Sequence, residues 1–122
     1  MAILLFHSFI TPQGRLFKRM QPVYDALVVP HANVRMVLCG HVVGRRNRID
    51  AFDDDGDGVA ERSVSIQLMN YQDESDRCGQ LRLLTFDTAA RSITITTYSP
   101  VTDCQYRDGT HAEIMYTMEN AF

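Results

Sequence analysis

The sequence is poor in the features that mark several classes of protein. It has three cysteines, no tryptophan, and no apolar run near the roughly 20 residues of a membrane-spanning helix. Cys39, Cys78 and Cys104 form no Cys-x-x-Cys pair, which argues against a disulfide scaffold and against a structural zinc site. Because Cys39 ends an apolar run, we expect a buried, unreactive thiol there. The cysteine content favours a reducing compartment, so we expect a cytoplasmic protein.

The chain also lacks an excess of charge of one sign. Its 12 basic and 15 acidic residues give a net charge of −3, and this balance does not favour a nucleic-acid partner. The apolar residues 1–6 follow no basic segment and precede no small-residue cleavage site, so they predict a strand rather than a signal peptide. With 122 residues and no linker or repeat, the sequence predicts one domain over residues 1–122 and no membrane partner.

Apolar patterning predicts a parallel strand–helix–strand unit at the start of the chain. Residues 2–7 and 34–39 are largely apolar runs, typical of strands that are buried on both faces. Between them apolar residues recur at helical spacing, with Pro22 in the predicted first turn and Pro30 at the end of the helix. A connection of this kind is right-handed and places its two strands in parallel.

The rest of the sequence predicts antiparallel hairpins. Residues 45–52 and 59–68 flank an acidic turn that contains glycine, and residues 81–86 and 92–97 flank a second turn. Residues 112–118 are expected to form a last strand. The predicted fold class is therefore α/β, with the strand–helix–strand unit continued by a meander of antiparallel hairpins.

Two histidines follow the two predicted parallel strands. His7 ends the first strand, and His41 follows the second strand after Gly40. Open α/β sheets bind ligands at the carboxyl ends of their strands, so the two imidazoles could share one divalent ion. The alternative is that each histidine is hydrogen-bonded to a loop. His31 and His111 are expected to be ordinary surface residues.

Five segments of the sequence, taken in order, resemble the calcineurin-like metallophosphoesterases. The most telling is Asn33-Val-Arg-Met-Val-Leu-Cys-Gly-His41, which is similar to the strand that leads into the family's GHxH motif; the others are residues 4–8, 68–72, 79–87 and 93–100. In this family two metal ions, about 3.5 Å apart, activate a hydroxide that attacks phosphorus. The resemblance implies a phosphoric ester hydrolase that uses manganese, zinc or iron. It implies that His7 and His41 are ligands of the same ion, since His7 matches the family's lone histidine and His41 the first histidine of GHxH.

The chain departs from the family pattern in two ways. Val43 stands where the second histidine of GHxH would be, and the DxH, GD and GNH segments do not occur. The resemblance therefore implies about half of a metallophosphoesterase β-sandwich, the carboxyl-terminal half, which is weakly active or inactive alone. One alternative is a non-catalytic binding or self-assembly module, either a homo-oligomer or a chain whose exposed sheet is covered by a partner segment. Another is a fragment of a longer gene product.

The acidic turn begins like a calcium loop. Asp53, Asp55 and Asp57, followed by Gly58, match the D-x-D-x-D-G pattern, and Glu61 could add an oxygen ligand. The twelfth position of the loop is Val64, where such loops have a bidentate glutamate. The turn is thus either a calcium site or a solvated hairpin tip.

Basic and aromatic residues near the histidines offer further candidates. Arg45 and Arg46, with Arg48 beyond them, follow His41 closely and could bind the phosphate of a phosphate-ester substrate, because guanidinium groups suit bidentate phosphate recognition. The alternative is that these charges protect the edge of a sheet from pairing. Tyr71 and Tyr98 are expected to be structural, with paired hydroxyl groups.

Overall fold

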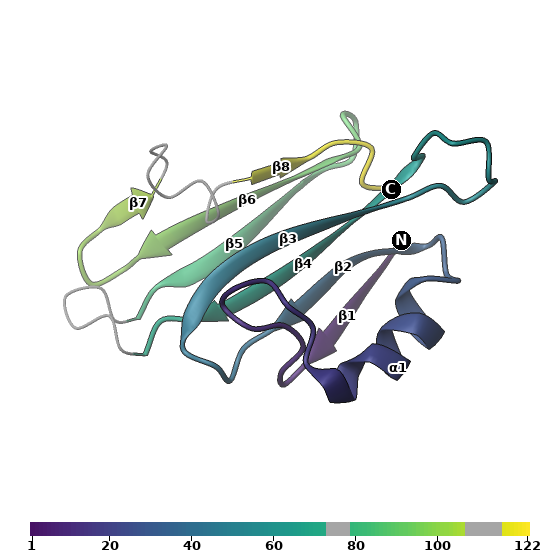
Figure 1. Ribbon diagram of the computed structural model, residues 1–122. Coiled ribbons are helices and arrows are strands. Elements are labelled where there is room, and N and C mark those ends of the chain that lie inside the picture. The colour runs from purple at the N-terminus through teal and green to yellow at the C-terminus, as the bar shows by residue number, and fades with distance from the viewer. Residues whose placement is uncertain (73–78, 107–115) are drawn as a thin grey trace.

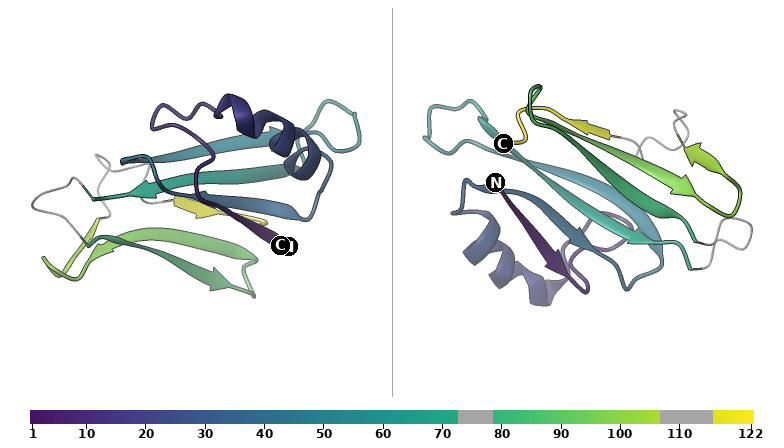
Figure 2. Two further views of the ribbon diagram at one scale, coloured as in Figure 1. Left: turned by 90° about the horizontal axis from the view of Figure 1, so that it is seen from below. Right: turned by 180° about the vertical axis from the view of Figure 1, so that it is seen from behind.

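Two β-sheets form two layers in the computed structural model, which describes residues 1–72, 79–106 and 116–122 (Figure 1). The first sheet has the order β1-β2-β4-β3, formed by β1 (Ala2–Phe6), β2 (Val34–Cys39), β4 (Arg62–Asn70) and β3 (Gly44–Phe52). In the second sheet β6 (Ser92–Ser99) lies between β5 (Leu81–Asp87) on one side and β7 (Cys104–Tyr106) and β8 (Tyr116–Met118) on the other. A helical segment covers the outer face of the first sheet (Figure 2).

The predicted strand–helix–strand unit is present, and the α/β fold class is confirmed. Strands β1 and β2 pair in parallel, with Leu4 opposite Val37. The helical segment between them comprises a 3₁₀ turn (Lys18–Met20), α1 (Gln21–Val23) and a π-helical turn (Tyr24–Val28). Pro22 lies in the first turn of α1, where its missing N–H removes no helical hydrogen bond, and the segment ends before Pro30.

The first hairpin joins the sheet differently from a simple meander. Strand β4 pairs in parallel with β2, with Met36 opposite Ser65, and its antiparallel partner β3 forms the edge of the sheet. Strand β4 is buried along residues 64–68, whereas β3 is partly or fully exposed throughout. The strand that is buried on both faces takes the interior position, and the arginine-rich strand takes the edge, where its charges discourage pairing with other chains.

The second predicted hairpin builds the second sheet. Strands β5 and β6 pair in antiparallel register, with Leu84 opposite Ile95. The predicted last strand is present in part as β8, and its residues 112–115 lie outside the described part of the chain. The short strand β7 has no counterpart in the sequence prediction, because three residues are too few to show a pattern.

The core consists of two apolar layers. Between the helical segment and the first sheet lie buried side chains of β2 and β4 together with Phe9, Ile10 and Val28. Between the two sheets lie Met36, Ile93, Ile95 and Met118. Among the described residues, no helix is long and apolar enough to cross a membrane.

A buried arginine anchors the acidic hairpin to the helical segment. Arg62 is 3% exposed, and its Nε and Nη2 atoms each lie 2.7 Å from a carboxylate oxygen of Asp54. The same guanidinium donates to the carbonyl oxygens of Val28 and Val29, at 3.3 and 3.0 Å, and lies 4.1 Å from the centre of the Phe52 ring. It therefore supplies donors for carbonyl groups that have no partner within the helix at its carboxyl end.

Candidate functional site

The two histidines that follow the parallel strands lie side by side. The centroids of the His7 and His41 rings are 4.4 Å apart, with the ring planes tilted by 41°. The register places Phe6 opposite Cys39, and the Gly40 N–H donates to the His7 carbonyl at 3.1 Å, so the parallel pairing continues beyond the strands. The structure thus brings together the pair that the sequence predicts, at the carboxyl ends of β1 and β2.

The backbone of His41 is held in an uncommon conformation. Its φ angle of 66° lies in the left-handed region, which residues other than glycine rarely adopt. The Asn70 side chain donates to the His41 carbonyl oxygen at 2.9 Å, so the end of β4 fixes this turn. The residue in this conformation carries an exposed imidazole whose ring lies beside that of His7.

The histidine pair places two imidazoles close enough to be considered as ligands of one metal ion. Protein sites of this kind use three side-chain ligands and leave one position for water or substrate. Within residues 1–72, 79–106 and 116–122, no third histidine, cysteine or carboxylate joins His7 and His41 in a cluster. Val43 is exposed on the same loop and offers no ligand atom.

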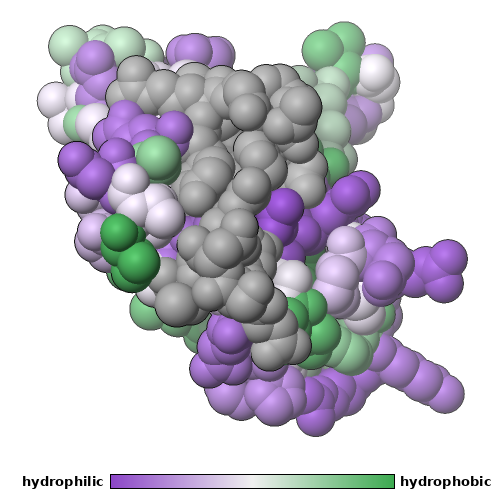
Figure 3. Space-filling view, turned by 90° about the vertical axis from the view of Figure 1, so that its left-hand side faces the viewer, coloured by the Kyte–Doolittle hydropathy of each residue, from purple (hydrophilic) through white to green (hydrophobic). Residues whose placement is uncertain are grey.

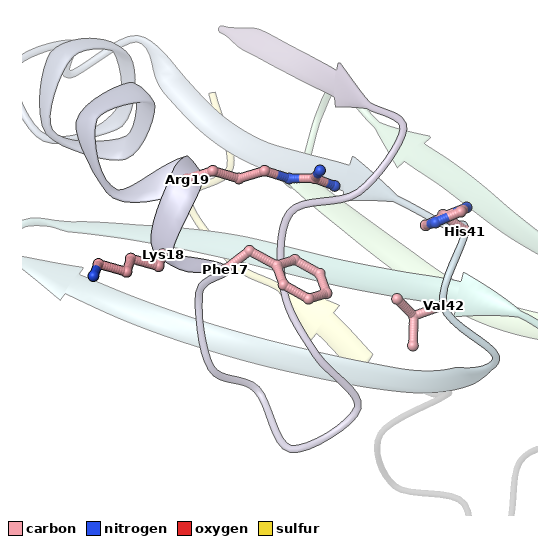
Figure 4. A pocket seen from close by; sticks show the side chains of 5 residues that line it. All are labelled: Phe17, Lys18, Arg19, His41 and Val42. Carbon is pink, nitrogen blue, oxygen red and sulfur yellow. The ribbon is translucent and has the colours of Figure 1, made fainter.

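A hollow of about 400 Å³ opens beside His41 (Figure 4). Its lining residues come from the 3₁₀ turn with the residue before it and from the loop after β2; they are Phe17, Lys18, Arg19, His41 and Val42. Figure 4 shows the side chains of Phe17 and Arg19 extending toward the loop that carries His41 and Val42, and the Val42 side chain facing Phe17, whereas the Lys18 side chain extends the opposite way. The Arg19 guanidinium donates to Ser8 Oγ at 2.7 Å and lies 5.7 Å from the centre of the Phe17 ring.

The arginines predicted to bind substrate lie on the edge strand. Arg45 and Arg46 are opposite Met69 and Leu68 in the β3–β4 pairing, and neither lines the hollow. Arg48 has a structural role, because it binds Asp50 at 2.7 Å and the Gly14 carbonyl at 3.1 Å. Their position agrees with the alternative that these charges protect the sheet edge.

The residues that sequence reasoning missed are Phe17 and Arg19. A basic pair beside an aromatic residue is a weak local signal, and nothing in the neighbouring pattern connects it with His41. The connection depends on the loop after β1, which folds back so that the Phe17 N–H donates to the Phe9 carbonyl at 3.1 Å. This return places the 3₁₀ turn over the carboxyl ends of the strands.

The acidic turn between β3 and β4 forms a second cluster of candidate ligands. One carboxylate oxygen from each of Asp53, Asp55, Asp57 and Glu61 lies within 4.8 Å of the others, so the cluster could hold a metal ion. The Gly58 and Gly56 N–H groups donate to the Asp53 carboxylate at 2.8 and 2.6 Å, and these hydrogen bonds lower its pKa. Asp54 faces away from the cluster toward Arg62.

The other predicted residues have the following positions. Cys39 is buried and Cys104 is exposed, while Cys78 and His111 lie outside the described residues. The Tyr71 hydroxyl accepts from Arg82 at 2.9 Å, and the Tyr98 hydroxyl donates to Asp103 at 2.9 Å, so both tyrosines are structural as predicted.

Comparison with known proteins identifies one similar protein. The uncharacterized protein YvnB of Bacillus subtilis (strain 168) is 40% identical over 110 residues, which make up 88% of this chain and 8% of YvnB. The chain thus spans less than a tenth of that relative, whose name assigns no activity. No family model matches the chain, and no solved structure matches it.

Proposed function

We propose that the chain is the carboxyl-terminal half of a metallophosphoesterase-like domain, a phosphoric ester hydrolase. The observation that supports this proposal is the contact between His7 and His41, whose ring centroids are 4.4 Å apart at the ends of neighbouring parallel strands. The resemblance of the sequence to that family assigns the same two residues to one ion. The similarity to a short part of YvnB is consistent with a segment that works within a longer protein.

The residues present could supply part of the ligand set of a metal ion. Two exposed imidazoles on a fixed backbone can each direct a ring nitrogen to one manganese, zinc or iron ion. Such an ion lowers the pKa of a bound water and neutralises charge on phosphoryl oxygens. His7 and His41 would hold and orient it, and the remaining ligands would come from polypeptide outside this chain. Alone, the chain is expected to be weakly active or inactive.

Metal titration of the isolated chain tests this proposal. Isothermal titration calorimetry is expected to show weak binding of zinc or manganese to the wild-type chain. The single variants His7→Ala and His41→Ala should each show no binding. His31→Ala is the matched control, because His31 is exposed and lies apart from the pair in the turn before β2. Zinc binding that survives both substitutions would contradict the metal site.

A hydrolysis assay tests whether the isolated chain has phosphoesterase activity. Bis(p-nitrophenyl) phosphate is expected to be hydrolysed slowly or not at all by the isolated chain with manganese. Rapid turnover that His41→Ala abolishes would show that the chain, or a second copy of it, completes the ligand set, and would overturn the proposal of a half domain.

Self-assembly is a second candidate function, favoured by the edge strand β1. Among the described residues β1 pairs only with β2, its residues carry no charge, and Leu5 is 74% exposed. Uncharged, uncovered edge strands tend to pair with other chains. On the face shown in Figure 3, by contrast, the hydrophobic side chains of the described residues are scattered among hydrophilic ones. Light scattering should show a dimer or larger oligomer that Leu5→Lys dissociates, and a monomeric wild-type chain would refute this candidate.

For the acidic turn we propose calcium as the ion. Calcium prefers oxygen ligands, and four carboxylates lie within 4.8 Å of one another at the tip of the hairpin. Calcium is expected to raise the thermal midpoint of the wild-type chain and to leave that of the double variant Asp53→Asn, Asp55→Asn unchanged. Asp25→Asn, a change at an exposed aspartate elsewhere, should respond like the wild type. Equal shifts in all three proteins would refute a site at the turn.

A further inference from the structure

The lining of the hollow beside His41 has a cationic part and an apolar part. Arg19 directs its guanidinium toward the region between Phe17 and His41 (Figure 4). Ser8, which is 5% exposed and follows His7 directly, accepts one hydrogen bond from the Arg19 Nη2 atom at 2.7 Å. A guanidinium carries five N–H donors in a planar fork, so this contact orients the group and leaves donors for a ligand.

The opposite part of the lining is apolar. Phe17 is half-buried, and its backbone is held at both sides, since its N–H donates to Phe9 and its carbonyl accepts from Met20 at 2.7 Å. The Val42 side chain lies beside the Phe17 ring in Figure 4. A fixed aromatic ring with an aliphatic neighbour suits a planar organic group, because stacking on an aromatic face needs no hydrogen bonds.

The charge and size of the hollow define the ligand further. No acidic residue is among the residues that line it, although the whole chain has a net charge of −3. Its volume of about 400 Å³ lies in the range of small-molecule sites. A ligand that matches both parts has an anionic group at Arg19 and a planar group at Phe17.

We propose that this hollow is the substrate pocket and that it takes a phosphate ester of a planar aromatic group, such as a nucleoside monophosphate. The phosphate binds Arg19 beside the histidine pair, and the aromatic group packs between Phe17 and Val42. The inference rests on the proposed phosphoesterase function, because it places the phosphate next to His7 and His41. It adds the class of the organic group, which the metal site alone leaves open.

Binding to the isolated chain without metal tests the inference separately from catalysis. In the presence of EDTA, adenosine monophosphate is expected to bind about tenfold more tightly than glycerol phosphate, since one stacked base supplies that difference. Phe17→Leu should remove the difference, and Arg19→Gln should weaken both ligands about tenfold. Arg15→Gln removes an exposed charge from the same loop, does not line the hollow, and should bind like the wild type.

Chemical shifts of the wild-type chain make the test independent of how the variants fold. Adenosine monophosphate should shift the amide resonances of Val42 and His41, with no comparable change at the acidic turn. Equal affinity for adenosine monophosphate and glycerol phosphate, or shifts confined to another surface, would overturn the inference. The results distinguish the two proposals. If the histidine pair binds zinc but the chain does not prefer adenosine monophosphate over glycerol phosphate, only the proposed function is supported. If the chain has this preference but binds no zinc, only the pocket is supported.

Discussion

Replacing Arg62 by methionine tests how the acidic hairpin is joined to the rest of the fold. Methionine keeps part of the unbranched stem but cannot donate hydrogen bonds. The change removes both contacts to Asp54, both contacts to the carbonyl groups of Val28 and Val29, and the stacking on Phe52. The side chain is 2% exposed, so water cannot simply take over its position.

The loss in free energy of unfolding can be worked out from the groups that lose their contacts with Arg62. Leaving the carbonyl groups at the end of the helical segment without a donor costs about 1–3 kcal/mol. The lost stacking of the guanidinium on Phe52 adds about 1 kcal/mol. Asp54 adds little, because its carboxylate is exposed enough to be solvated. The free energy of unfolding should therefore fall by about 3 kcal/mol, near the lower end of the values for breaking a buried ion pair.

Urea denaturation measures this loss directly. Thermal unfolding gives a second measurement: for a domain of this size, a loss of about 3 kcal/mol lowers the thermal midpoint by about 10 °C. Arg46→Met on the edge strand β3 is the control, because Arg46 is exposed and a surface change of this kind alters stability by only about 0.5 kcal/mol. If Arg62→Met costs less than about 1 kcal/mol, the guanidinium does not anchor the hairpin and the reasoning is wrong.

Three further predictions concern other parts of the fold. Burial and a hydrogen bond to the neighbouring Asp50 carboxylate raise the pKa of Tyr24 above its ordinary 10.0. The stability that protonated Tyr24 contributes is therefore fully present below pH 10 and is lost at higher pH. Tyr24→Phe should be less stable than the wild type at pH 7, and urea denaturation at pH 11 should show a smaller difference. Gly44→Ala should lower the free energy of unfolding by about 1–3 kcal/mol in the same assay. The φ angle of Gly44 is 129°, and a new Cβ would lie 3.2 Å from the ring of Pro12. An unchanged urea midpoint would contradict this strain. Burial raises the pKa of the Cys39 thiol, so peptide mapping after brief iodoacetamide treatment should find Cys104 modified before Cys39. Equal labelling of these two cysteines would count against a buried thiol.

Local patterns were sufficient to predict most of the elements. The strand β2 was predicted at residues 34–39, as the structure has it, because a short apolar run between turn residues has few other solutions. The end of the helical segment before Pro30 was predicted, since proline constrains the backbone wherever it occurs. Its start was not, because the 3₁₀ turn Lys18–Met20 precedes Pro22 and does not use the N–H group that proline lacks. These signals act within a few residues and do not depend on the rest of the fold.

The order of strands was harder to predict, because it depends on partners far along the chain. Strand β4 has an interior position, yet Ser65 and Gln67 make it look half-exposed. Both are buried because they have polar partners: Ser65 donates to Asn47 at 3.0 Å, and Gln67 accepts from Arg82 at 2.7 Å. A buried polar residue is stable only with its partner present, so the pattern of β4 alone resembles that of a half-buried strand.

The histidine pair and the acidic turn are separate clusters, and the topology explains why. Strands β1, β2 and β4 are parallel, and the histidines follow the carboxyl ends of β1 and β2. The acidic turn precedes the amino end of β4, so it lies at the opposite end of the same sheet (Figure 1). Its carboxylates therefore cannot join His7 and His41 around one ion.

This separation makes a crossed prediction. The change His41→Ala should abolish zinc binding and leave the response to calcium unchanged. The change Asp55→Asn should weaken the response to calcium and leave zinc binding unchanged. Calorimetric titration of both variants with both ions measures all four combinations. If either substitution altered the binding of both ions, the two clusters would be coupled, and the prediction of two independent clusters would be wrong.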